Sequence, residues 1–300
     1  MDLERSVADM MLRQLVPALS LWLGLVSGRA QVTLSLHREQ EQFLPAERLP
    51  ITVHIENQSG RTLTFGTSPN WLIFGVETLQ GRVVSKLSDV PVDGEFRLES
   101  AERAKFTINL APHFALQEPG QFQVTAQMTV PGTGEFLSAS PVVFEVLNGS
   151  RLWSQEFGIP PAPGAGNALP EIRKYHLQQA NHLKQIRLYV RITDASETRT
   201  FATFPAGTLV TFAKPEPMVD KLGRLHLLHQ FGIRSYTYHL VDPDGTVKVR
   251  QTYEMTGTMR PALKVNAEGE VRVLGGARRE TTADLPPAAP VDIETKNPKP

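Results

Sequence analysis

The chain has 300 residues, with 31 lysines and arginines against 31 aspartates and glutamates, and it contains no cysteine. A balanced charge provides no electrostatic case for binding nucleic acid or an anionic membrane. The lack of cysteine excludes disulfide bonds, thiolate catalysis, cysteine metal ligands and a lipid anchor on an N-terminal cysteine.

Residues 1–30 have the features of a signal peptide. Arg13 follows a start-competent Met11, and an uncharged apolar run covers residues 15–26. Such a run is too short to cross a bilayer, which takes about 20 residues. The acidic character of the preceding residues suggests that translation begins at Met10 or Met11.

Small residues at Gly28 and Ala30 predict cleavage between Ala30 and Gln31. We therefore expect an exported protein, periplasmic or extracellular, with no membrane span in the mature chain.

Residues 31–148 predict a β-sandwich. Val32–His37 and Ile51–Glu56 alternate apolar and polar residues with period two, and turn residues follow at Asn57–Gly60. Further short strand-like runs separated by turn signals continue to Leu147, and no amphipathic helix interrupts them. This spacing is typical of an all-β sandwich.

Two stretches carry a resemblance to a known group. Residues 43–60 read FLPAERLPITVHIENQSG, and residues 116–124 read LQEPGQFQV. They resemble the opening and a later strand of bacterial extracytoplasmic immunoglobulin-like domains, a group that includes the BsuPI-type proteinase-inhibitor domain. The resemblance covers the N-terminal half and implies an immunoglobulin-like β-sandwich. Its motifs are structural, so it implies little about activity.

Two segments have the composition of connecting or unstructured chain. Residues 149–170 are rich in proline and glycine from Gly158 onward and predict a linker between two domains. Residues 281–300 are rich in proline, alanine and charge and predict a disordered tail.

Residues 171–280 predict a second, β-meander domain with an internal repeat. Residues 217–228 align with residues 263–274, and each unit reads as a strand, a turn with Asp or Asn and Gly, and a second strand. Two further strand-like runs lie between the aligned units, so one repeat of about 45 residues would hold four strands, as a β-propeller blade does. The domain could therefore consist of partial blades. Any β-meander with such turns would also produce the alignment. Free edges at Tyr236–Val241 and Val247–Tyr253 would favour a homodimer.

The C-terminal histidines raise the question of a metal site. His226 and His229 are three residues apart in a predicted strand, so they should point to opposite faces and cannot share one ion. We expect core histidines, with no metal and no cofactor. The histidines of this region are His176, His182, His226, His229 and His239.

Acidic residues in the same region could supply a pair for glycoside hydrolysis, but all lie in or beside predicted turns, where they are expected to be solvated turn formers. The acids are Asp194, Glu197, Glu216, Asp220, Asp242 and Asp244. Asp242-Pro243-Asp244-Gly245 lacks the further carboxylates of a calcium loop and predicts a hairpin turn.

Three weaker signals have structural explanations. Gly164-Ala165-Gly166 lacks the strand and the third glycine of a dinucleotide site, since Leu169 stands there. Asn57-Gln58-Ser59 and Asn148-Gly149-Ser150 match the glycosylation sequon but predict turns. The tyrosines suit a binding surface or a strand core, and the core is favoured. They are Tyr175, Tyr189, Tyr236, Tyr238 and Tyr253.

Three hypotheses for function follow. The leading one is a non-enzymatic structural or binding module of the periplasm or cell surface, with an unidentified protein or glycan ligand. The first alternative is a proteinase inhibitor acting through loops of the N-terminal sandwich, as the BsuPI-type resemblance implies. The second is a sugar-active enzyme built on the C-terminal domain. No site residue for catalysis, cofactor or metal binding is assigned.

Overall fold

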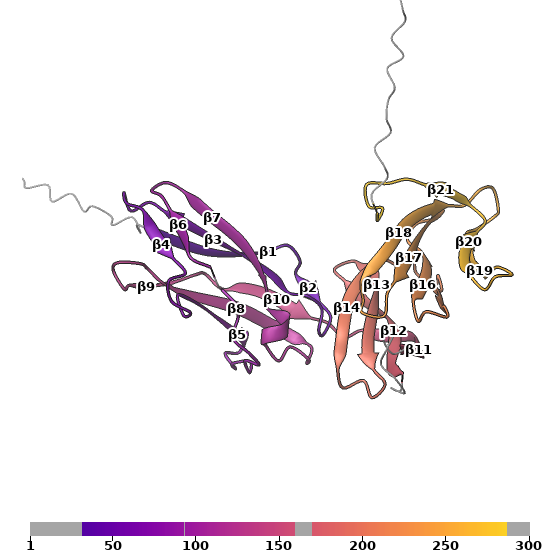
Figure 1. Ribbon diagram of the computed structural model, residues 1–300, viewed down its shortest axis with the longest axis horizontal. Coiled ribbons are helices and arrows are strands. Elements are labelled where there is room, and N and C mark those ends of the chain that lie inside the picture. The colour runs from indigo at the N-terminus through magenta and orange to yellow at the C-terminus, as the bar shows by residue number, and fades with distance from the viewer. Residues whose placement is uncertain (1–31, 93, 160–169, 287–300) are drawn as a thin grey trace, which may run out of the picture.

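A computed structural model describes residues 32–92, 94–159 and 170–286, and it folds into two β domains joined by a single connection (Figure 1). The predicted cleavage site at Ala30 and Gln31 lies outside these residues. No helix in the described ranges has the length and apolarity needed to cross a membrane. The predicted all-β fold of sandwich type is confirmed.

The N-terminal domain is a sandwich of two main sheets. One contains β1 (Val32–Arg38), β3 (Pro50–Asn57) and β7 (Arg103–Asn109), all antiparallel. The other has the order β2-β10-β8-β5, with β9 (Phe136–Ser138) on β8. Its strands are β2 (Gln42–Phe43), β10 (Val142–Val146), β8 (Gly120–Thr129) and β5 (Leu72–Thr78).

The first segment of the chain contributes to both sheets of this domain. β1 pairs antiparallel with β3, whereas β2 crosses over and pairs parallel with β10. Placing consecutive strands in opposite sheets ties the two sheets of the sandwich together. A short pair, β4 (Leu63–Phe65) with β6 (Phe96–Leu98), and a 3-10 turn at Ala111–His113 complete the domain.

The predicted alternation in this domain explains its core. Ile51, Val53 and Ile55 of β3 are fully buried between the sheets. Thr52, on the opposite face, meets Thr107 of β7 with their hydroxyls 2.9 Å apart. Asn57 ends the strand as predicted, and its buried side chain donates to the carbonyls of Arg61 and Leu98.

The C-terminal domain has two facing antiparallel sheets. The first has the order β11-β12-β13-β14, from β11 (Ser150–Ile159), β12 (Glu171–His182), β13 (Gln185–Asp194) and β14 (Thr200–Thr208). The second has the order β15-β16-β17-β18-β21, from β15 (Glu216–Val219), β16 (Leu225–Gln230), β17 (Ser235–Val241), β18 (Val247–Glu254) and β21 (Ala277–Arg279). Leu177, Ile192 and Leu227 are fully buried between them.

The aligned repeat corresponds to two hairpins. One is β15–β16, and the other is β19 (Ala262–Val265) with β20 (Val271–Leu274), which forms a separate two-stranded sheet. Both turns place a glycine at positive φ, 74° at Gly223 and 81° at Gly269. The β19–β20 hairpin covers the outer face of the second sheet, where Leu263 packs against Tyr236 and Tyr238. The repeat therefore builds hairpins, and the second one does not continue into a four-stranded unit.

The predicted linker at 149–170 needs correction. Residues 150–159 form β11 and pair with β12 along its length. A register shift between Arg151 and Trp153 breaks the alternation that would have revealed the strand. Phe157 stacks on Tyr175 at 4.2 Å between ring centroids, which anchors β11 to the core. The connection between the domains is thus the short stretch before β11, while residues 160–169 lie outside the described ranges.

The predicted tail is also partly wrong. Residues 281–286 pack on the second sheet, where Arg250 and Leu285 exchange backbone hydrogen bonds of 2.9 and 3.0 Å. Asp284 is buried and accepts from Arg278 and from the Thr281 hydroxyl. Local ion pairing thus orders a segment whose composition indicates disorder. Residues 287–300 lie outside the description.

The strands expected to form free edges are internal. β17 lies between β16 and β18, and β18 lies between β17 and β21. The edge argument for a homodimer therefore does not apply to Tyr236–Val241. In β18, β21 pairs only with Thr252–Glu254 and Leu285 bridges Arg250, so the edge of Val247–Tyr253 is covered in part.

Candidate functional site

A cleft of about 790 Å³ lies between the two domains. From the N-terminal domain it is lined by the 43–49 loop and residues around the 3-10 turn, including Phe114 and Leu116. From the C-terminal domain it is lined by Thr198, by residues 200–205 and by Gly245, Val247 and Arg250. Clefts between domains are common places for ligands.

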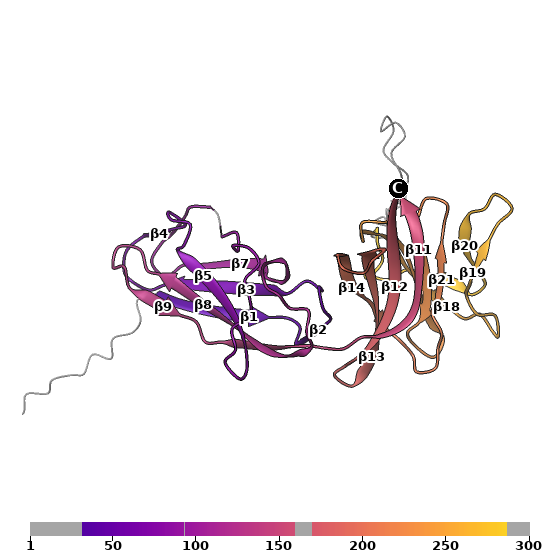
Figure 2. The same cartoon turned by 90° about the horizontal axis from the view of Figure 1, so that it is seen from below.

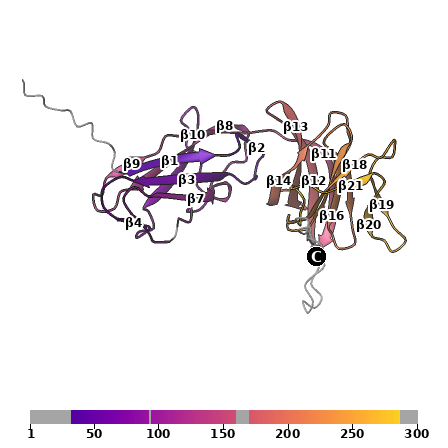
Figure 3. The ribbon, with the colours of Figure 1, turned by 90° about the horizontal axis from the view of Figure 1, so that it is seen from above.

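A small contact at one end of the cleft holds the domains together. Leu44 packs with Ala180 and Tyr189, and Leu147 adds to the cluster. The backbone N–H of Leu183 donates to the Gln42 side-chain oxygen at 2.7 Å. Figures 2 and 3 show the chain crossing once between the domains at this end. The cleft is therefore bounded at this end by a small contact rather than by a broad interface.

The C-terminal wall of the cleft is formed by an edge strand. β14 pairs with β13, and no other strand of the described chain pairs with its second edge. Consecutive residues 200–205 line the hollow, so the strand meets it along its edge rather than with one face. Two register shifts in the β13–β14 pairing also bend the strand.

Two arginines flank an aromatic ring at the start of β14. The guanidinium carbons of Arg173 and Arg199 lie 4.0 and 4.7 Å from the ring centroid of Phe201. Arg173 also donates to the carbonyl of Pro243 at 2.9 Å. Cations over an aromatic face are stabilised by its quadrupole. Arg173 also pairs with Glu171 at 2.8 and 3.1 Å, so Glu171 offsets one of the two positive charges at this end of the strand.

Of the described residues that line the cleft, Glu47 alone is acidic, and its carboxylate is already engaged. One oxygen accepts from the backbone N–H of Leu44 at 2.8 Å, and the other accepts from the Gln40 amide at 3.0 Å. Burial raises the pKa of Glu47, although these hydrogen bonds oppose the shift. Glu47 therefore stabilises the 44–47 turn. The neighbouring Arg48 also lines the cleft, and its side chain is exposed.

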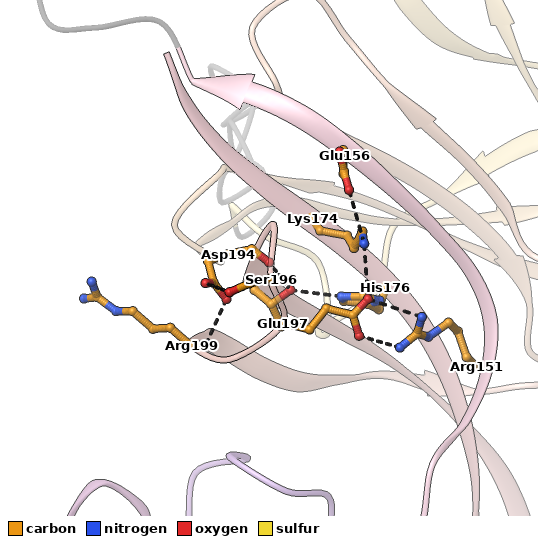
Figure 4. A network of polar contacts seen from close by, with 9 residues as sticks. Arg151, Glu156, Lys174, His176, Asp194, Ser196, Glu197 and Arg199 are labelled. Carbon is orange, nitrogen blue, oxygen red and sulfur yellow. Dashed lines mark hydrogen bonds and ion pairs between the residues drawn. The ribbon is translucent and has the colours of Figure 1, made fainter. Parts of the chain in front are cut away.

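The six acids considered for hydrolysis are held in turns or ion pairs. Asp194 accepts from the N–H of Arg199 at 2.8 Å, and Glu197 of the same turn pairs with Arg151 at 2.6 Å and with Lys174 at 3.2 Å (Figure 4). Hydrogen bonds from these two cations outweigh the effect of burial and lower the pKa of Glu197.

The other acids have similar local roles. Asp220 pairs with Arg224 at 2.7 Å, and Asp242 pairs with Lys248 at 3.2 Å. Asp244 accepts from the N–H of Thr246 at 2.8 Å in the predicted hairpin turn, and Glu216 accepts from the N–H of Leu263 at 3.0 Å.

The five C-terminal histidines are all buried, but they do not form a single cluster. His226 faces the β19–β20 hairpin, where its Nδ1 lies 2.8 Å from the Tyr238 hydroxyl. His229 faces the other sheet and stacks on His239 at 5.8 Å between centroids. The two therefore point to opposite faces, as the strand geometry predicts. Among the described residues no three histidines, aspartates or glutamates form a metal-binding group.

One polar cluster was not anticipated from the sequence. Besides its contact with Tyr238, His226 reaches Asp220 with its Nε2 at 3.2 Å, and both side chains are buried. Burial lowers the pKa of His226 despite the opposing effect of Asp220. Tyr238 joins this cluster through the pairing of β16 with β17, which the sequence alone does not reveal. The one signal in the sequence was the six-residue spacing of Asp220 and His226.

The remaining sequence signals fall in structural positions or outside the description. The fully buried Asn57 side chain makes its sequon a turn, whereas Asn148 is exposed next to β11. Tyr175 and Tyr189 are fully buried, and Tyr175 donates to the carbonyl of Gly223 at 2.9 Å. Gly164, Gly166 and Leu169 lie outside the described residues.

Comparisons with known proteins leave the family open. No family model matches the chain. No curated protein matches it either. Among solved structures, the chain is similar to the sporulation control protein Spo0M from Bacillus subtilis at 10% sequence identity and a TM-score of 0.30. That match covers 57% of this chain and 83% of Spo0M. A likeness this weak carries no argument about function.

Proposed function

We propose that this protein is an exported, non-enzymatic binding module that holds an extended segment of a partner protein in the cleft between its domains. The segment would add as a strand to the free edge of β14. The observation that carries the proposal is a strand edge, unpaired among the described residues, that lines the cleft between the domains. Strand addition uses main-chain hydrogen bonds for affinity and side-chain pockets for specificity.

The composition of β14 supports this role. Residues 200–208 read TFATFPAGT and contain no charge. The opposite edge of the same sheet, β11, carries Arg151 and Glu156. Charged side chains on an edge discourage pairing with another chain. The β11 edge of the sheet therefore carries charges that disfavour pairing with another chain, whereas the β14 edge, which lines the cleft, is uncharged and available for pairing.

The surroundings of the edge indicate what kind of segment would fit. Pro205 lacks an N–H, which limits main-chain pairing to residues 200–204. Arg48, Arg199 and Arg250 are exposed in or beside the cleft, whereas Glu47 is buried and engaged. An extended segment with apolar residues alternating with acidic ones would match both the strand face and the charge.

Hydrogen exchange with synthetic peptides tests the proposal. An extended Val-Glu repeat peptide should slow amide exchange within residues 200–204 of the full chain, while β11 should not change. A Val-Lys repeat and a backbone N-methylated Val-Glu repeat should have no effect. Binding of the Val-Glu peptide without protection of β14 would contradict strand addition.

Charge-reversal variants test the role of the cleft arginines. Arg48→Glu with Arg199→Glu should weaken binding of the Val-Glu peptide by about tenfold, because both cations flank the edge. Arg82→Glu with Arg272→Glu, at exposed positions outside the cleft lining, is the matched control. Equal affinity in the two double variants would show that the cleft charge plays no part.

The two alternative hypotheses are separated by simple assays. A proteinase inhibitor should slow members of a protease panel, and the effect should follow substitutions in the N-terminal loops. A sugar-active enzyme should release product from a panel of glycans. Neither activity requires the β14 edge, so both can be judged independently of the peptide experiments.

A further inference from the structure

The C-terminal domain exposes large apolar side chains at one end. The exposed fractions are 64% at Leu183, 98% at Phe212, 92% at Ile233 and 63% at Met259. Large apolar residues exposed together mark interaction surfaces rather than folding requirements.

These residues belong to four neighbouring loops, which we call the tip loops: residues 182–184, 209–215, 231–234 and 255–261. Leu209 donates to the carbonyl of Ile186 at 2.8 Å, and Val210 donates to that of Gln230 at 3.1 Å. Met255 donates to the carbonyl of Arg234 at 2.9 Å. Backbone hydrogen bonds thus link the loops in a row. They lie at the end of the domain where the chain arrives from the N-terminal domain, the lower end in Figure 2.

Each apolar tip has a basic neighbour in sequence. Lys184 follows Leu183, Lys214 comes two residues after Phe212, Arg234 follows Ile233, and Arg260 follows Met259. The tip loops contain no aspartate or glutamate. The charge of the whole chain is balanced, whereas the tip loops themselves carry only basic charges. Glu216, just outside these loops, lies 4.0 Å from Arg260 and offsets that one cation in part. The balanced composition of the whole chain therefore does not describe the local charge of these four loops.

The backbone adds a further observation. Phe212 and Leu183 adopt positive φ, at 67° and 56°. The left-handed region favours glycine or asparagine, so a fold alone would not select large apolar residues there. Their side chains contribute little to either core cluster of the domain. Their presence at the loop tips therefore calls for a contact outside the chain.

We propose that the tip loops dock this protein on the surface of an anionic phospholipid bilayer. Leu183, Phe212, Ile233 and Met259 would enter the boundary between headgroups and acyl chains, and the adjacent cations would pair with lipid phosphates. Peripheral binding of this kind increases with the apolar area buried and with attraction to anionic lipid. Separate tips that each combine one apolar and one basic residue fit a layered lipid surface better than a flat protein interface.

A fluorescent label at a single site tests the insertion. The chain has no cysteine, so Phe212→Cys provides a unique thiol for an environment-sensitive dye. Vesicles of phosphatidylglycerol and phosphatidylcholine should shift its emission to shorter wavelength, and vesicles of phosphatidylcholine alone should not. Leu222→Cys is the matched control, because Leu222 is exposed beside Lys221 at the opposite end of the same sheet.

Charge reversal tests the electrostatic part. Lys184 and Lys214 are exposed and make no hydrogen bond or ion pair among the described residues, so Lys184→Glu with Lys214→Glu should leave the fold intact. Each basic residue near an anionic bilayer is worth about a fivefold change in partitioning, so the double variant should bind at least about twenty-five times more weakly. Lys105→Glu with Lys221→Glu carries the same charge change elsewhere. Residues 1–30 are identical in all variants, so their own lipid affinity cancels.

Four outcomes would overturn the proposal. The label at 212 could stay in water on anionic vesicles, or the label at 222 could respond equally. The two double variants could bind anionic vesicles alike. A shift at 212 that grows with protein concentration without vesicles would assign the tip loops to a second copy of the chain.

Discussion

The two domains share a sandwich architecture but differ in what their cores contain. The N-terminal core is built from aliphatic and aromatic side chains, including Trp71, and its histidines lie outside it. The C-terminal domain buries five histidines, among them His176, His229 and His239. Buried imidazoles leave the fold sensitive to protonation, whereas an apolar core is not. Similar sheets can thus produce domains with different responses to pH.

The largest expected effect is acid destabilisation of the C-terminal domain. Burial lowers the pKa of His176 and His229 to about 4 and that of His239 to about 3. In the unfolded chain the same rings titrate near the ordinary value of about 6.5. The free energy of unfolding should be level above that value and fall as the pH drops toward 4. At pH 5 the loss is about 2 kcal/mol for each ring.

Calorimetry at neutral and acidic pH measures this difference between the domains. We expect two unfolding transitions, of which only the C-terminal one moves strongly between about pH 7 and pH 5. His229→Leu with His239→Leu should reduce that shift, because the buried imidazoles are removed. Equal movement of both transitions would show that the contrast between the two cores does not control acid stability.

A matched pair of cavity variants tests whether the domains unfold independently. Ile55 and Ile192 are fully buried, one in each main core. Replacing either by alanine should cost about 2–5 kcal/mol. Because the contacts between the domains in the described residues are few, a small cluster around Leu44 and Tyr189 and a hydrogen bond from Leu183 to Gln42, each variant should shift its own transition. A common shift of both transitions would mean that the two domains unfold as one unit.

The smallest expected effect concerns the charged cluster on the outside of the C-terminal domain. Glu197→Gln removes the ion pairs to Arg151 and Lys174. These groups are partly exposed, so water screens them and the loss of stability should stay below about 1 kcal/mol. Chemical denaturation at neutral pH measures it, with Glu156→Gln as a control that removes one pair to Lys174. A loss of several kcal/mol would show that this exposed ion-pair cluster contributes to stability as strongly as groups buried in the core do.

Several features of the fold were predictable from local patterns. The alternation of Ile51, Val53 and Ile55 identified both the strand and its buried face. The three-residue spacing of His226 and His229 placed them on opposite sides of a strand. The turn residues at Asp220–Gly223 and Asn266–Gly269 located two hairpins, because glycine is needed where φ is positive. In each case neighbouring residues carry enough information to determine the local geometry.

Other features depended on contacts between distant segments. β11 was hidden by a register shift and becomes a strand only through pairing with β12. Residues 281–286 are ordered by Asp284 and by pairing with Arg250. The Asp220–His226–Tyr238 cluster requires the pairing of β16 with β17.

The sequence by itself determined that this is an all-β chain with a sandwich in its N-terminal half and hairpins in its C-terminal half, since alternation and turn chemistry act over a few residues. Only the tertiary structure decided which strand edge faces the cleft and which loops meet at the tip of the C-terminal domain. Both depend on how strands far apart in sequence are ordered within the sheets. That order is set by burial over the whole domain rather than by local patterns.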